Sequence, residues 1–114
     1  MFLFPDHEEQ YQKLIQRDGT NPSDVERKAM FYIFAGNQDL FNKVETLYDF
    51  EERMIRPECF RSIDLSTSAH DLIELAFNLY NNYYCGTIVE MFSYLDQQNR
   101  RLAIEAIKMR FIVA

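Results

Sequence analysis

The 114-residue chain contains only three glycines, three prolines and two cysteines, and it has no tryptophan. The glycines Gly19, Gly36 and Gly86 are too widely spaced for a phosphate-binding loop or a dinucleotide-binding turn, which disfavours a nucleotide-dependent enzyme. We therefore predict no cofactor. Two thiols in a domain of this size usually behave as small buried apolar groups, so we predict that Cys59 and Cys85 do not form a disulfide.

Long apolar runs are missing as well. The N-terminus, MFLFPDHEEQ, has four apolar residues before Pro5 and lacks both the basic start and the longer apolar stretch of a secretory signal. No run of about 18 apolar residues occurs anywhere, so the sequence predicts no transmembrane helix. We expect a cytoplasmic protein without a membrane partner.

The composition that remains is that of a folded domain, with 47% apolar and 26% charged residues. Ten phenylalanines and seven tyrosines predict a core rich in aromatic rings. A chain of this length is expected to form one domain, residues 1–114, around a single core. The formal net charge of −6 repels phosphate backbones, which makes nucleic acid a disfavoured partner.

The spacing of apolar residues predicts helices along most of the chain. Helical stripes occur within residues 6–19, 23–35, 37–50, 66–84 and 87–114, and the last of these is expected to break near Asp96. No alternating β pattern of useful length appears. The sequence therefore predicts an all-α fold, a compact single-domain bundle of five or six helices.

Two segments qualify this pattern. Ser23 and Glu26 have the spacing of a capping box, and the helix that they start is apolar on nearly every side, so we predict that residues 23–35 form the central helix. Residues 51–68, EERMIRPECFRSIDLSTS, have weaker periodicity around Pro57 and predict a frayed helical turn followed by a loop.

The stretch AFNLYNNYYCGTIVEMFSYL, residues 76–95, combines aromatic rings, asparagines and a glycine. Asparagine tolerates the left-handed backbone, and a tyrosine can bury its ring while its hydroxyl reaches water, so the stretch is typical of a corner between two helices. A ligand-binding version of the same segment would turn Asn82, Tyr83 and Tyr84 toward a partner.

His70, Asp71 and Glu74 lie on one helical turn and are the strongest candidates for chemistry. Zinc patterns usually bring at least three ligands in tight pairs, and neither His7 nor the cysteines complete such a pattern by spacing, so we predict no metal site. A small enzyme that uses this cluster or Cys85 remains the alternative to a binding protein.

The C-terminal region is locally basic. Residues 97–114 carry four basic side chains against Glu105 alone: Arg100, Arg101, Lys108 and Arg110. Basic residues near a helix end complement the helix dipole, but they also form one basic face on an acidic protein. Nucleic-acid binding through this helix is a weaker alternative.

Both ends of the chain are apolar, MFLF at the start and KMRFIVA at the end. Such patches are usually covered, either by the core of the same domain or by another subunit. The second case would give a homodimer with Phe111 as an anchor.

The segments DVERKAMFYIFAGNQDLFNK, YDFEERMIRPEC and AFNLYNNY carry a resemblance. With them the chain resembles an uncharacterised family of short proteins from low-GC Gram-positive bacteria and their mobile elements. The resemblance covers most of the chain. It implies a bacterial or phage-borne cytoplasmic protein, and it assigns no catalytic or binding residue because the family has no assigned activity.

Together these observations favour a non-enzymatic module that binds another protein, with a homodimer as one form of that binding. Interfaces are enriched in aromatic residues and arginine. The candidate binding residues are therefore Asn82, Tyr83, Tyr84, Arg100, Arg101, Lys108, Arg110 and Phe111.

Overall fold

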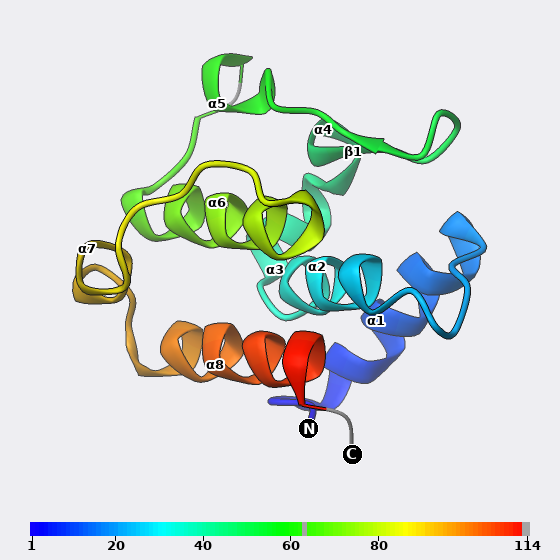
Figure 1. Ribbon diagram of the computed structural model, residues 1–114, viewed down its shortest axis with the longest axis horizontal. Coiled ribbons are helices and arrows are strands. Elements are labelled where there is room, and N and C mark those ends of the chain that lie inside the picture. Colours follow the sequence, from blue (N-terminus) through cyan, green and yellow to red (C-terminus); the bar gives the residue numbers. More distant parts are fainter. Residues whose placement is uncertain (63, 113–114) are drawn as a thin grey trace.

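The computed structural model describes residues 1–62 and 64–112 and is mostly helical (Figure 1). Its four long helices are α1 (Pro5–Asp18), α2 (Val25–Ala35), α6 (Thr67–Asn81) and α8 (Gln97–Phe111). Shorter helices join them: α3 (Gln38–Asn42), α4 (Val44–Leu47), α5 (Cys59–Ser62) and α7 (Ile88–Ser93). Within the described ranges there are thus eight helices, where the sequence predicted five or six. None of them is both long enough and apolar enough to cross a membrane.

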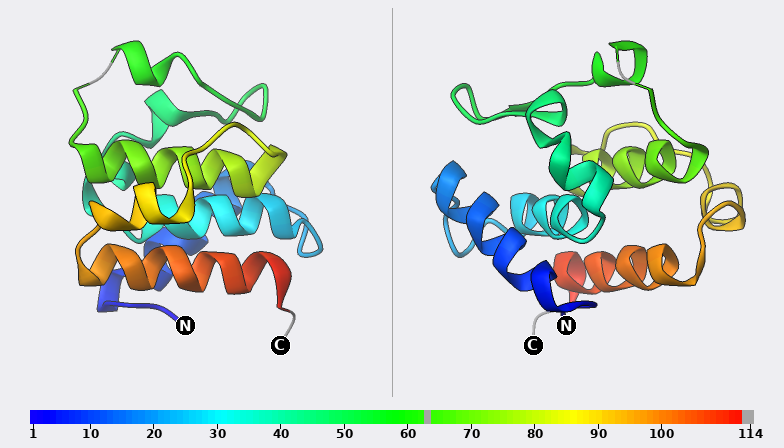
Figure 2. Two further views of the ribbon diagram at one scale, coloured as in Figure 1. Left: turned by 60° about the vertical axis from the view of Figure 1, so that its left-hand side comes forward. Right: turned by 180° about the vertical axis from the view of Figure 1, so that it is seen from behind.

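Helix α2 is the centre of the fold, as predicted. Helices α6 and α8 pack on opposite sides of it, and α1 covers it from behind (Figures 1 and 2). Every side chain from Ala29 to Ala35 is buried. Three of these side chains are aromatic, Phe31, Tyr32 and Phe34, and burial of each ring contributes about 2 kcal/mol to folding.

The two ends of α2 explain how its neighbours come so close. Asp24, rather than the predicted Ser23, caps the helix by accepting from the Arg27 amide, because the Ser23 amide and hydroxyl both donate to Asn21 instead. At the other end a Cβ on Gly36 would lie 2.8 Å from His7 Nε2 and would overlap Leu102. Glycine is therefore what allows His7 of α1 and Leu102 of α8 to pack against this end of α2.

Residues 37–50 do not form the single helix that their periodicity predicts. The helix stops at Lys43, resumes as α4, and ends at Tyr48, where β1 (Tyr48–Asp49) begins an antiparallel pair with β2 (Met54–Ile55). The Asp49 carboxylate accepts from the amides of Glu51 and Glu52, both at 2.9 Å. Side-chain bonds of this kind compete with helical hydrogen bonds and stabilise a turn. The prediction of no β structure is therefore wrong for this short hairpin.

The predicted corners around α6, α7 and α8 are confirmed. Ser66 caps α6, and Asn82 closes it in the left-handed conformation with φ 65°. Thr87 and Glu90 form a capping box at the start of α7. Asp96 caps α8, which places the break between the last two helices where the sequence predicts it.

Phe2 and Leu3 of the apolar N-terminus pack against the core, whereas Met1 is 82% exposed. The Phe2 ring lies 5.6 Å from the Tyr11 ring and 5.8 Å from the Tyr32 ring. His7 is fully buried between its two hydrogen bonds, one from the Leu3 amide to Nδ1 and one from Nε2 to the Tyr32 carbonyl. Burial lowers the pKa of His7 and so favours the neutral form of its ring. The C-terminal residues 113–114 lie outside the described residues.

Candidate functional site

A buried polar network joins α1, α2, the hairpin and α6. The Asp18 side chain is wholly shielded and accepts from Thr20, from the Tyr48 hydroxyl at 2.7 Å, and from two Arg53 nitrogens at 3.0 Å each. Burial alone would raise the pKa of Asp18, but the hydrogen bonds from Arg53, Thr20 and Tyr48 outweigh it and hold that pKa below the usual value. The carboxylate is thus ionised and fully paired.

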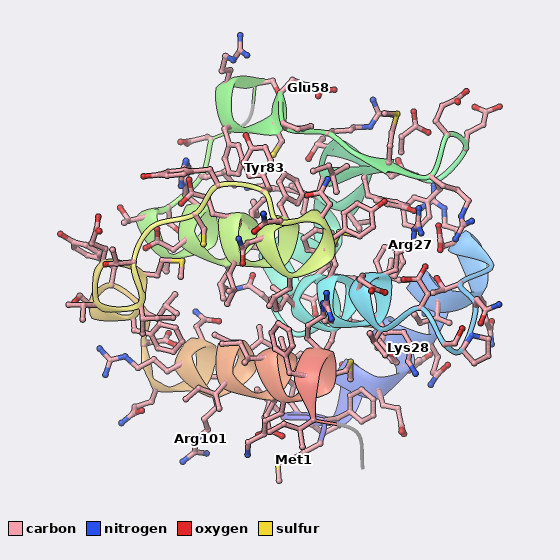
Figure 3. All side chains as sticks on the ribbon, in the orientation of Figure 1. Met1, Arg27, Lys28, Glu58, Tyr83 and Arg101 are labelled. Atoms are coloured by element: carbon pink, nitrogen blue, oxygen red, sulfur yellow. The ribbon has the colours of Figure 1, made fainter. Side chains whose placement is uncertain are left out.

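Arg27 extends this network across the molecule (Figure 3). Its guanidinium donates to the hydroxyls of Tyr48 and Tyr80, both at 3.0 Å, and to the carbonyl of Arg53 at 3.0 Å. It also pairs with Asp24 at 2.9 Å. Burial and the Asp18 carboxylate raise the pKa of Tyr48 to about 12, so its hydroxyl stays protonated as a donor. Every charged side chain in this network has a partner of opposite charge or a hydrogen-bond partner. The network therefore stabilises the fold, and it leaves no charged group available to bind a ligand.

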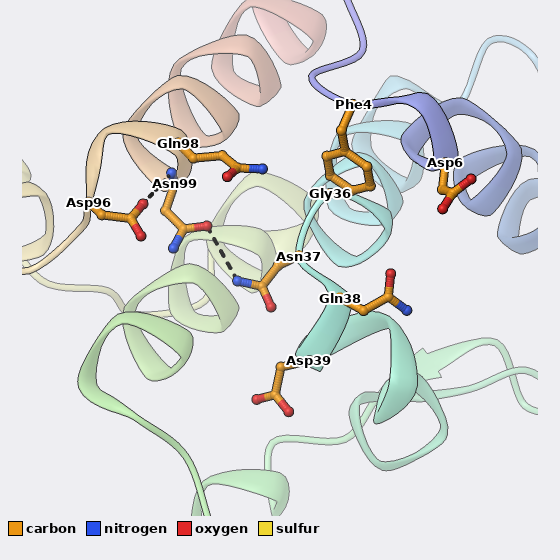
Figure 4. A pocket seen from close by; sticks show the side chains of 9 residues that line it. All are labelled: Phe4, Asp6, Gly36, Asn37, Gln38, Asp39, Asp96, Gln98 and Asn99. Atoms are coloured by element: carbon orange, nitrogen blue, oxygen red, sulfur yellow. Dashed lines mark hydrogen bonds between the residues drawn. The ribbon is translucent and has the colours of Figure 1, made fainter.

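A polar cleft of about 500 Å³ opens between the start of α1, the α2–α3 junction and the start of α8 (Figure 4). Around Phe4 and Gly36 its lining carries three carboxylates and four side-chain amides: Asp6, Asp39, Asp96, Asn37, Gln38, Gln98 and Asn99. These residues include no basic side chain. The cleft therefore offers acceptors to a cation or to a group rich in N–H donors.

Part of this lining is already engaged. Asn37 donates to the Asn99 side chain at 3.3 Å, Asp96 accepts from the Asn99 amide at 2.8 Å, and Asp39 pairs with Lys43 at 3.1 Å. The carboxylates also lie in the first turns or at the cap of their helices, where they complement the helix dipoles. The cleft is thus an acidic surface with a structural role of its own.

A second depression, of about 350 Å³, runs along α7 and is lined by Ile88, Val89, Phe92, Ser93 and Arg100. Two of its apolar side chains are largely exposed, Ile88 at 60% and Val89 at 76%. Arg100 is held at its edge by a 2.9 Å bond from Nε to the Phe92 carbonyl. Large exposed apolar groups that lie together are typical of protein-binding surfaces.

The depression along α7 and the polar cleft are both lined by residues at the start of α8. Asp96, Gln98 and Asn99 line the cleft, whereas Arg100 lines the depression. Tyr94, in the turn before α8, is 67% exposed. This end of the molecule therefore presents apolar, acidic and basic groups side by side.

The structure brings the predicted cluster on α6 together. One donor atom from each of His70, Asp71 and Glu74 lies within 4.8 Å of the other two. The Phe60 ring packs against the His70 ring with centroids 4.6 Å apart. Burial raises the pKa of Asp71 and of Glu74, and the nearby Glu90 carboxylate raises that of Asp71 further.

The cysteines are both free, as predicted, and neither is prepared for nucleophilic chemistry. Burial raises the pKa of the Cys59 thiol to about 11. Burial and the charge of Glu74 also raise the pKa of Cys85. A nucleophilic cysteine needs a lowered pKa, so the alternative that assigns catalysis to Cys85 loses support.

The aromatic residues of the α6–α7 corner divide into packed and exposed ones. The Tyr83 ring lies 6.2 Å from the Phe60 ring and 5.6 Å from the Phe77 ring, so it is part of the core edge (Figure 3). Asn82 is exposed and closes α6. Tyr84 is 80% exposed and is the member of the three whose ring can meet a partner.

Most of the basic residues predicted for binding have partners within the chain. Lys108 pairs with Glu105 at 3.0 Å, and Arg110 donates to the Leu79 carbonyl at 2.9 Å while lying over the Phe111 ring. Arg101 points outward from α8 and lines a 360 Å³ depression together with the N-terminal residues (Figure 3). Phe111 is 64% exposed.

Sequence reasoning missed the polar cleft and the exposed face of α7. The cleft combines residues from three distant segments. In the sequence, its carboxylates Asp6, Asp39 and Asp96 have the positions of ordinary residues at helix starts. For α7 a signal was present, because the adjacent Ile88 and Val89 cannot both point inward from a short helix.

The chain belongs to a family of unknown function, DUF6075, whose model matches residues 1–113. No curated protein and no solved structure matches the chain. The family has no assigned activity, so membership in it does not indicate a function.

Proposed function

We propose that this protein is a non-enzymatic module that binds another protein at its α7–α8 surface, which consists of Ile88, Val89, Phe92, Tyr94 and Arg100. The observation that carries the proposal is the exposure of three large apolar side chains, Ile88, Val89 and Tyr94, within seven residues. Interfaces place aromatic and aliphatic anchors of this kind at their centre and polar groups at their rim.

The groups around this surface indicate the chemistry of the partner. The shallow depression along α7 offers apolar contact to a partner side chain, and Arg100, whose Nε donates to the Phe92 carbonyl, can donate through its terminal nitrogens to an acceptor on the partner. The adjacent cleft supplies carboxylate and amide oxygens to a basic or amide group. A partner segment that combines an apolar anchor with a basic residue therefore fits best.

A homodimer is one form of this binding. Glu90 and Arg100 give the α7–α8 region charges of both signs, so two copies related by a twofold axis can pair unlike charges around the apolar centre. The mass of the protein measured by light scattering over a concentration series tests this directly. A constant monomer mass at high concentration removes the homodimer and leaves a different protein as the partner.

The two alternative functions have less support. The enzyme would rest on His70, Asp71 and Glu74, which converge without an activated nucleophile beside them. Nucleic-acid binding would need a free basic face, yet Lys108 is paired with Glu105 and Arg110 donates to the Leu79 carbonyl.

We also propose that the protein is cytoplasmic and is encoded by a bacterium or its mobile elements, which is what the resemblance described above implies. Neighbouring genes in its own genome test this origin. Phage or plasmid genes on both sides would support a mobile element, and a host operon would point to a chromosomal role.

The binding proposal is tested by capture from the native cell with the wild-type protein and two matched variants. Val89→Asp places a charge in the centre of the α7–α8 surface, whereas Met54→Asp makes the same kind of change at a 54% exposed position on the hairpin. We expect a protein that is retained by the wild type and by Met54→Asp and is lost from Val89→Asp. Identical capture by all three chains would contradict the proposal, provided that their unfolding curves coincide.

A further inference from the structure

We propose that His70, Asp71 and Glu74 form a binding site for a divalent transition-metal ion of the zinc class, in contrast to the prediction from residue spacing that the chain has no metal site. The proposal is independent of protein binding at the α7–α8 surface. It is carried by the convergence of the three donors and by a shielded carboxylate oxygen that has no hydrogen-bond partner.

The three donors are placed by one rigid element. His70 and Glu74 are four residues apart on α6, so their side chains lie on the same face, and Asp71 is three residues before Glu74. His70 Nδ1 is 4.0 Å from Glu74 Oε1. Two ligands of a tetrahedral ion with bonds of 2.0–2.1 Å are about 3.4 Å apart, so small side-chain rotations bring both atoms to ligand distance.

Asp71 supplies the second observation. Its Oδ2 atom is shielded from water and has no hydrogen-bond partner among the described residues. Shielded polar atoms in folded proteins nearly always have a partner, so an unpaired oxygen on a carboxylate that also belongs to this cluster requires an explanation. A bound cation supplies the missing interaction.

The donor set selects the class of ion. An imidazole nitrogen suits zinc, copper, iron or nickel, whereas magnesium and calcium prefer oxygen ligands. Three protein ligands leave at least one coordination position for water or for a group from a partner. His70 is 41% exposed, so an ion can reach the site from solvent, and the Phe60 ring beside it limits how the imidazole can turn.

The free thiols have to be separated from this site in any experiment, because zinc also binds cysteine. Neither Cys59 nor Cys85 belongs to the group of donors within 4.8 Å of one another. Replacement of Cys85 by serine therefore tests thiol binding without touching the proposed ligands.

The test is calorimetric titration of the full chain with Zn²⁺ under reducing conditions without a chelator, together with the visible absorption of added Co²⁺. We expect one ion per chain. Both His70→Gln and Asp71→Asn should weaken binding at least about tenfold, whereas Cys85→Ser and the exposed control Glu51→Gln should leave it unchanged. The Co²⁺ spectrum should show nitrogen and oxygen ligation without a thiolate band.

Two results would overturn the proposal. One is the absence of saturable binding tighter than about 1 mM. The other is binding that Cys85→Ser abolishes and His70→Gln leaves intact, since that would assign the ion to a thiol. The heat of Zn²⁺ binding is measured without the protein partner, so failure here is distinct from failure of the capture experiment.

Discussion

Asp18 is a buried aspartate, whereas Asp71 is half-buried with one shielded oxygen, and the two carboxylates have opposite settings. Four hydrogen bonds from Thr20, Tyr48 and Arg53 reach Asp18, and they keep its pKa low despite burial. Asp71 has an oxygen without a partner, and burial raises its pKa. The Asp18 carboxylate is thus fully hydrogen-bonded within the fold, whereas one oxygen of the Asp71 carboxylate can accept an interaction from a bound group.

The same contrast separates the two regions around them. The network of Asp18, Arg27, Tyr48 and Arg53 ties α1, α2 and the hairpin together and reaches α6 through Tyr80. The α6–α7 end instead carries the cluster of His70, Asp71 and Glu74 and the exposed apolar side chains of α7. We infer that the paired region maintains stability and that the unpaired region is used for recognition.

The largest expected effect comes from neutralising the two aspartates in turn. Asp18→Asn should lower the free energy of unfolding by about 3 kcal/mol, because it leaves the Arg53 guanidinium and a buried hydroxyl without their charged acceptor. Asp71→Asn should change it by less than about 0.5 kcal/mol, since it breaks no bond. Urea unfolding of both variants measures the difference, and equal losses would contradict the contrast.

A smaller loss in the free energy of unfolding is expected when the guanidinium group of Arg27 is replaced by the ammonium group of lysine, which keeps the charge. Arg27→Lys cannot reach Tyr48, Tyr80 and Asp24 at once, so we expect a cost of about 2 kcal/mol. Arg17→Lys is the matched control, because Arg17 forms an exposed pair with Glu45 and exposed pairs contribute little. Thermal unfolding should separate the two variants clearly. Similar melting temperatures would mean that the network adds little to stability.

For the region around the Asp18 network, the sequence predicted the helices but not the contacts between them. Apolar periodicity predicted α1, α2, α6 and α8, and the expected break near Asp96 predicted where α8 begins. The network itself depends on the hairpin, which brings Tyr48 and Arg53 to Asp18 although they lie 30 and 35 residues away in the sequence. Local periodicity contains no information about such a contact, so the hairpin and the network were both missed.

The candidate sites follow the same rule. His70, Asp71 and Glu74 were found from the sequence because they share one helical turn. The polar cleft was not found, because Asp6, Asp39 and Asp96 meet only after α1, α3 and α8 have packed around α2. Tyr83 looked like Tyr84 in the sequence, and only packing against Phe60 and Phe77 tells them apart.

The smallest expected effect is in the pH dependence of stability, where the two aspartates should act with opposite sign. The folded-state pKa of Asp18 is below its ordinary value of 3.8, so its stabilisation is complete above that value and is lost as the pH falls toward the lower pKa. For Asp71 the folded-state pKa is above 3.8, so stability falls as the pH rises from 3.8 to the raised pKa.

Urea unfolding between about pH 3 and pH 6 measures both slopes. Relative to the wild type, Asp18→Asn should flatten the loss of stability in acid, and Asp71→Asn should remove a small decline toward neutral pH. Parallel curves for the wild type and both variants would mean that neither pKa is shifted in the way described.

Photo-crosslinking in the native cell tests the central claim, recognition at the α7–α8 surface, most directly. A photoreactive amino acid replaces Val89 in one chain and Met54 in another, since both positions are exposed but lie on different regions. The account predicts a discrete covalent adduct, with a partner protein or a second copy, from position 89 and none from position 54. An adduct from position 54 alone, or none from position 89 although the protein folds and is produced, would contradict it.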